Sequence, residues 1–241
     1  MHRNVTSESR LFDEIQRGAL ISIPIVIGFI PFGLLLGAQA AQKSFSFFSL
    51  TMMTGLNFAG GSEFAAIALW TSPPHILTIV LISLLINSRH LLMGAAMTPL
   101  LAPLPPRKAL LALFFMCDEC WAMSMNDAAR RREQGKPAFS GGFYAGVAAT
   151  LWFCWVLSTG IGVIIGPVLG DITRWGFDMA FPAVFLVLLK GMWKGARAAL
   201  PWLVSLICAA TTWHFVPGAA YVPAGALSGV AAILLLNRKA S

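Results

Sequence analysis

Charged residues are scarce in this sequence. Only 11% of its 241 residues are Asp, Glu, Lys or Arg, whereas 57% are hydrophobic and the mean hydropathy is +0.75. A soluble globular domain has about 25% charged residues. The composition therefore argues against a soluble enzyme and predicts a protein whose solvent is lipid.

Cysteine is also rare, and the chain has no long polar segment. Cys117, Cys120, Cys154 and Cys208 all fall in apolar segments, where a thiol usually packs as a small hydrophobe. Cys117 and Cys120 have CxxC spacing, but no second cysteine pair or histidine pair stands nearby to complete a zinc site. We therefore expect no disulfide framework, no bound metal and no cofactor.

Long charge-free runs are the main positive signal. A membrane-spanning helix needs about 20 apolar residues, so this length allows about eight spans and no separate soluble domain. The fold class we predict is an all-α, polytopic membrane protein with about eight transmembrane helices, seven being the alternative. The predicted spans are 18–42, 46–70, 75–101, 108–127, 141–168, 176–191, 197–214 and 221–237.

The ends of the chain are polar and short. Residues 1–17 are predicted to be a cytoplasmic segment, 18–237 a single transmembrane domain, and 238–241 a short cytoplasmic tail. The first apolar run lacks a small-residue cleavage site, so we expect it to remain as a helix.

The distribution of Lys and Arg predicts the orientation, because positively charged loops stay in the cytoplasm. With the N-terminus inside, twelve of the seventeen basic residues fall on the cytoplasmic side. The opposite side then holds Lys43, Arg107, Lys108 and Arg174, and Arg89 lies within a span. We expect both termini in the cytoplasm. Because the basic residues are scattered over short loops, the net charge of +7 does not indicate nucleic-acid binding.

Three clusters of helix breakers interrupt the predicted spans. They centre on Pro31, on Gly60-Gly61 and on Pro182, and we predict a broken helix near each. Transporters use such discontinuous helices to hold small charged ligands, with half-helix N-termini facing anionic groups. A simple packing kink is the alternative.

Five ionisable residues lie at membrane depth, namely Glu63, Arg89, Asp118, Glu119 and Asp178. Each costs at least about 2.5–3.5 kcal/mol at a helix centre, so each needs a partner or a purpose. A structural ion pair or a position at a helix end would explain any one of these charged residues, but it explains the presence of all five less well than a functional role does. We expect Arg89 to form an ion pair, with Glu63 as the first candidate partner and Asp118 as the second. A substrate carboxylate is a further alternative. Asp118, Glu119 and Asp178 are candidate coupling or ion-pair residues.

The third predicted span has one polar or small face. Ser83, Asn87, His90 and Gly94 follow a 4-3-4 spacing, which places them on the same side of a helix. Such a face suits the lining of a cavity.

These segments together resemble a known family. The blocks that carry the likeness are Pro31-Phe32-Gly33-Leu34, Phe58-Ala59-Gly60-Gly61-Ser62-Glu63-Phe64, Ile86 to Met93 with its Asn-Ser-Arg-His core, Asp118-Glu119 and Phe177 to Ala183. They resemble the AzlC family of bacterial inner-membrane proteins, which is associated with export of branched-chain amino acids. In the family pattern the position of Glu63 is usually Gln, which leaves open a difference in substrate or coupling.

The resemblance implies a permease subunit and not an enzyme. It further implies a multi-pass protein of the bacterial inner membrane, export of branched-chain or other hydrophobic amino acids, and a small AzlD-like membrane subunit as partner.

These residues together predict a substrate-binding site. We predict that the substrate-binding residues are Arg89, Glu63, Asn57, Ser62, Gly60, Gly61, Asn87, His90, Pro31 and Phe32. Arg89 and helix N-termini would receive the carboxylate, and Glu63 or Asp118 the ammonium group. Phe29, Phe32, Phe58 and Phe64 would hold the apolar side chain. A buried carboxylate that carries a proton would couple efflux to the proton gradient.

Two other readings stay open. An intramembrane serine hydrolase would use Ser62 as its nucleophile and His90 or His214 as its base. A passive channel or a structural subunit of a complex would use the buried charges only for assembly.

Overall fold

The computed structural model describes residues 2–169, 186, 190, 193, 195–217 and 220–238. All regular elements in this part of the chain are helices, which confirms the predicted all-α class. Three of the helices described are long and apolar enough to cross a membrane. They are α1 (His2–Gln42), α4 (Ile76–Leu101) and α7 (Gly141–Leu169).

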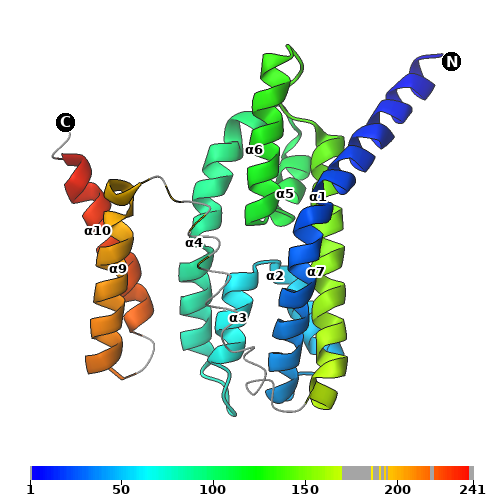
Figure 1. The fold of residues 1–241 in the computed structure, drawn as a ribbon. Helices are drawn as coiled ribbons and strands as arrows, with labels where there is room; N and C mark the ends of the chain where they lie inside the picture. The colour runs from blue at the N-terminus through cyan, green and yellow to red at the C-terminus, as the bar shows by residue number, and fades with distance from the viewer. Residues whose placement is uncertain are drawn as a thin grey trace.

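Helices α1 and α7 form the most extensive helix pair and run parallel (Figure 1). Gly33 lies against Ser158 and Gly37 against Gly162, so contacts advance together along both helices. Glycine at these positions lets the two backbones approach closely, as in other membrane helix pairs. The pair forms one wall of the bundle.

The predicted break near Pro31 is wrong, because α1 continues through both Pro24 and Pro31. A proline removes one backbone hydrogen bond, but the turns on either side keep theirs. The close contact of α1 with α7 spans the proline and holds the helix continuous.

The segment predicted as one span over 46–70 is a hairpin of two short helices. Helix α2 (Phe47–Asn57) ends at the middle of the bundle, and α3 (Gly60–Ala68) returns from there. Phe45 and Trp70, which flank the hairpin, touch with ring centroids 4.7 Å apart. The break near Gly60-Gly61 is thus confirmed, but the segment does not cross.

A second hairpin enters from the opposite end. Helix α5 (Pro106–Phe114) runs beside the first half of α7, and α6 (Asp118–Glu133) returns in contact with α7 and α4 until Asp127 meets Arg17 of α1. The prediction of one span over 108–127 is therefore wrong. The polar second half of α6, which ends in three arginines, favours return to the same water-facing end.

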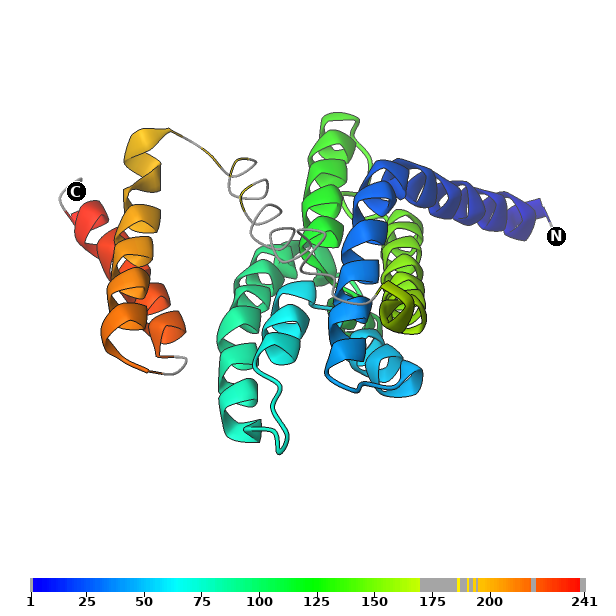
Figure 2. The same ribbon diagram turned by 60° about the horizontal axis from the view of Figure 1, so that its bottom comes forward.

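The two hairpins meet tip to tip between α1, α4 and α7. Figure 2 shows α3 lying along α4 and α1 lying along α7, as the contacts between these helices also indicate. The remaining helices, α9 (Ala196–Phe215) and α10 (Tyr221–Arg238), pair with each other on the outer side of α4 (Figure 1). Apart from residues 186 and 190, the predicted span 176–191, with Asp178 and the break at Pro182, lies outside the described residues.

Candidate functional site

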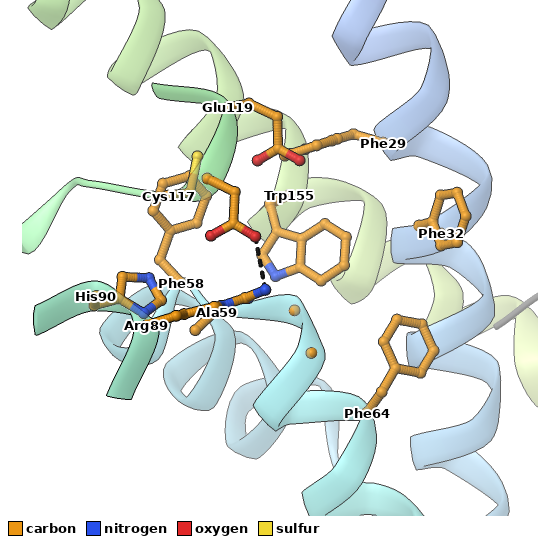
Figure 3. A pocket seen from close by; sticks show the side chains of 13 residues that line it. Phe29, Phe32, Phe58, Ala59, Phe64, Arg89, His90, Cys117, Glu119 and Trp155 are labelled. Atoms are coloured by element: carbon orange, nitrogen blue, oxygen red, sulfur yellow. Dashed lines mark ion pairs between the residues drawn. The ribbon is translucent and has the colours of Figure 1, made fainter. Parts of the chain in front are cut away.

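A cavity of about 110 Å³ lies where the two hairpin tips meet (Figure 3). Both half-helices that lead away from the tips, α3 and α6, begin at this cavity. Their first-turn N–H groups and helix dipoles therefore point toward it, which makes the site attractive to an anionic group. The cavity is lined by Phe29, Phe32, Phe58, Ala59, Gly60, Gly61, Phe64, Arg89, His90, Cys117, Asp118, Glu119 and Trp155.

The tip of the α2–α3 hairpin is held by side chains that replace helical hydrogen bonds. Phe58 adopts a left-handed conformation, with φ of 45° and ψ of 44°, at a cost of roughly 1–2 kcal/mol. The Ser62 hydroxyl donates to the Ala59 carbonyl at 2.9 Å. The Ala59 N–H in turn donates to Glu63 Oε1 at 3.1 Å. Side-chain hydrogen bonds therefore stabilise the break between α2 and α3.

Glu63 is only 1% exposed and forms the anchor of this tip. Its second oxygen, Oε2, accepts a hydrogen bond of 2.7 Å from the Trp155 indole N–H on α7. No ion pair to Glu63 is present among the described residues. The expected pair with Arg89 is therefore not formed, because N–H donors occupy both oxygens of Glu63.

The tip of the α5–α6 hairpin places two acids at the cavity. Cys117 precedes α6 in an extended conformation, and its sulfur accepts from the Cys120 N–H at 3.5 Å. Asp118 and Glu119 then occupy the first turn, where the helix dipole stabilises negative charge. Sequence reasoning missed this helix start, although acids at 118 and 119 followed by three arginines at 130–132 mark the two ends of a helix.

Arg89 pairs with Asp118, the second of the two predicted partners. Arg89 Nη1 lies 2.7 Å from Asp118 Oδ2 (Figure 3, dashed line), and both side chains are about one-third exposed and line the cavity. The pair is incomplete, because Arg89 Nε and Asp118 Oδ1 are buried without a hydrogen-bond partner in the described chain. One donor and one acceptor of this pair thus remain unpaired beside the cavity.

The other predicted polar residues are divided between the cavity and the layer behind it. His90 lines the cavity, with Nδ1 3.3 Å from the Asn87 carbonyl. Asn87, Asn57 and Ser62 form a hydrogen-bonded chain behind the tip that links α4 to the hairpin. Pro31 is exposed away from the cavity.

The apolar wall contains all four predicted phenylalanines, Phe29, Phe32, Phe58 and Phe64 (Figure 3). Trp155, which the sequence analysis missed, joins them, and its ring meets Phe29 edge to face at 5.5 Å. An indole N–H inside an apolar span needs a buried hydrogen-bond acceptor. This requirement is the feature of the sequence that could have indicated a contact between Trp155 and a buried acid.

The arrangement around Ser62 does not suit a hydrolase. Its hydroxyl donates to the Ala59 carbonyl and accepts from Asn57 Nδ2 at 2.9 Å, and it does not line the cavity. His214 is exposed at the end of α9. Within the described residues, no group of three or more His, Cys, Asp or Glu is placed to hold a metal ion.

Comparison with known proteins shows the family. Residues 24–169 match the family model described as AzlC protein. The chain is 30% identical to an uncharacterized membrane protein of Archaeoglobus fulgidus, over 80% of this chain and 82% of that protein. It is 27% identical to the inner membrane protein YgaZ of Escherichia coli, over 70% of this chain and 64% of that protein.

A further relative carries a functional name. The chain is 24% identical to the branched-chain amino acid transport protein AzlC of Bacillus subtilis, over 80% of this chain and 73% of that protein. No solved structure gives a significant match. On the family match, the helices and the named relatives, the chain is a membrane protein that belongs to the AzlC family.

Proposed function

We propose that this chain is a secondary transporter subunit that exports branched-chain or other hydrophobic amino acids across the bacterial inner membrane. The proposal places the substrate in the cavity between the hairpin tips. It includes a small AzlD-like partner subunit and the proton gradient as the energy source.

The incomplete Arg89–Asp118 pair is the observation that carries the proposal. An α-amino acid has a carboxylate and an ammonium group about as close together as the two charges of this pair. Its carboxylate would use the free Arg89 Nε–H, and its ammonium group would use the free Asp118 Oδ1. Charge-assisted hydrogen bonds of this type are about twice as strong as neutral ones, which suits recognition of a zwitterion.

The cavity wall supports a hydrophobic side chain on that amino acid. Apart from Arg89, His90 and the two acids of α6, the cavity is lined mainly by aromatic rings and glycines. A branched aliphatic group would bury its surface there, and each CH₂ removed from water contributes about 0.8 kcal/mol. The name of the Bacillus subtilis relative supports the same class of substrate.

The charge distribution supports an orientation with the N-terminus in the cytoplasm. Because α5 and α6 form a hairpin, Arg107 and Lys108 lie at the same end of the bundle as Arg130, Arg131 and Arg132, and not at the opposite end as the sequence analysis predicted. Among the described loops at the other end, Lys43 is the basic residue before α2. By the positive-inside rule the end rich in Arg and Lys is cytoplasmic.

Proton coupling and the partner subunit have separate support. Three acids, Glu63, Asp118 and Glu119, lie in or directly behind the cavity, and intramembrane carboxylates commonly serve as proton relays. Helix α4 exposes a row of leucines, with Leu77 72% and Leu91 77% exposed, which offers an apolar surface to a membrane partner.

The proposal is tested by binding and by efflux. Leucine binding to the purified protein is measured by calorimetry, and leucine efflux is measured in preloaded cells with and without the small subunit. Arg89→Gln should weaken binding at least about tenfold, because it removes a charged donor worth about 1.5–3 kcal/mol. Arg132→Gln, an exposed arginine outside the cavity, is the matched control and should bind as the parent does.

Saturable efflux that requires Arg89 supports the transporter. Unsaturable flux would instead indicate a passive channel. Absence of both binding and efflux, with the protein present in the membrane, contradicts the proposed function.

A further inference from the structure

The inner face of α6 connects the cavity to the cytoplasmic end of the bundle. Cys117, Cys120, Ser124, Asp127 and Arg131 recur at helical spacing and share this face. Cys117 lines the cavity, and Asp127 and Arg131 lie at the far end beside α1. Helix α1 also lines the cavity, through Phe29 and Phe32, and it meets α6 again at the Arg17–Asp127 ion pair.

Two polar groups between these ends have no hydrogen-bond partner in the described part of the chain. They are Trp121 Nε1 and Ser124 Oγ, both buried. Buried donors and hydroxyls are normally paired, so unpaired ones call for an explanation. Two such groups in succession on one helix face suit a route in which a passing polar ligand or its hydration water supplies the missing partner.

The cytoplasmic end of this face is closed by a network of charges. Arg17 of α1 donates to both oxygens of Asp127, at 2.7 and 3.1 Å, and its guanidinium lies 4.2 Å from the centre of the Phe143 ring. Glu14 accepts from Arg17 at 2.7 Å, from Arg131 at 3.1 Å and from Ser140 at 2.7 Å. The network joins α1, α6 and the segment before α7.

The network is well suited to open and close. Two arginines balance two acids, so the closed state carries no excess charge. The backbones of α1 and α6 approach each other much less than those of α1 and α7, and two ion pairs of the network join these helices. Bidentate Arg–carboxylate pairs hold a defined geometry and still dissociate when water enters.

We propose that the seam between α1 and α6 is the cytoplasmic entry route to the cavity and that the Arg17–Asp127 ion pair is its gate. The inference rests on the proposed function, since it supplies the path by which the substrate reaches the site. Breaking the pair lets the α6 half of the hairpin separate from α1, which exposes Ser124, Trp121 and finally Cys117 to the cytoplasm.

Cys117 provides a reporter that does not depend on transport. In a background in which Cys120, Cys154 and Cys208 are replaced by Ser, a small charged methanethiosulfonate reagent is applied to inside-out and to right-side-out vesicles. Asp127→Asn should raise the labelling rate of Cys117 about tenfold in inside-out vesicles, which corresponds to about 1.4 kcal/mol in the opening equilibrium. The rate in right-side-out vesicles should stay at the parent value.

Control variants separate the gate from general loosening. Arg132→Gln, at the same end but outside the network, should label as the parent does. Glu14→Gln, which removes the negative charge of the shared acceptor, should give an intermediate rate, and thermal unfolding in detergent shows whether each variant is folded. A folded Asp127→Asn protein that labels at the parent rate, or equally fast from both sides, overturns the gate. Loss of leucine efflux in the parent would contradict the proposed function instead, whatever the labelling shows.

Discussion

Glu63 accepts hydrogen bonds from three N–H groups, those of the Ala59 backbone, the Trp155 indole and, at 3.5 Å, the Asn57 amide. Glu63→Ala leaves the Trp155 and Ala59 N–H groups unpaired in a buried site, at about 1–3 kcal/mol for each. We expect this variant to lower the midpoint of thermal unfolding in detergent clearly. Glu63→Gln should have a smaller effect, because its amide keeps one acceptor.

A double variant tests the origin of this effect. Once Glu63 is Ala, Trp155→Phe removes a group that is already unpaired, so its further effect should be small. If the losses of stability in the two single variants simply add in the double variant, the hydrogen bond between Glu63 and Trp155 does not stabilise the tip of the α2–α3 hairpin.

At the scale of single residues the sequence predicted much of the site but not its pairing. The cost of charge in lipid identified Glu63, Arg89, Asp118 and Glu119, and three of these line the cavity. It did not predict that Arg89 pairs with Asp118 instead of Glu63. That pairing depends on the start of α6 at Asp118, which no Gly or Pro marks in the sequence. Trp155 was missed since one tryptophan in an apolar span looks like any other.

At the scale of helices, the contact of α1 with α7 depends on the absence of side chains. A methyl group at Gly37 would overlap the backbone of Thr159 and of Gly162. Gly37→Val should therefore separate the helices and reduce the yield of folded protein strongly, as seen by size-exclusion chromatography in detergent. Gly28→Ala, on the same helix with nothing within 4 Å, is the matched control and should fold normally.

The helices also show why hydropathy alone gave the wrong connections. A charge-free run of about 20 residues meets the length requirement for a span, whether it crosses or turns back halfway. The segments 46–70 and 108–127 have that length, yet each is divided into two helices by a short tip. Glycines at 60 and 61 indicated the first tip, whereas Phe115, Met116 and Cys117 gave no such indication of the second.

At the scale of the whole molecule, the two hairpins give the bundle opposed tips around one cavity. Each tip brings a half-helix N-terminus to the centre of the bundle without crossing it. Irregular backbone is tolerated at membrane depth where it is buried in protein or lines a cavity, and here it does both.

The hairpin architecture predicts which loops share a side of the membrane. If α5 and α6 form a hairpin, Arg107→Cys and Arg132→Cys lie on the same side, whereas a single span over 108–127 would separate them. Each is introduced with the four native cysteines replaced by Ser, and is labelled with an impermeant maleimide in intact cells and in inside-out vesicles. We expect both to label only in inside-out vesicles, and Lys43→Cys, at the other end, to label in intact cells. Labelling of Arg107→Cys and Lys43→Cys from the same side would show that α5 and α6 cross the membrane as one helix, and the cavity between the hairpin tips would then not exist.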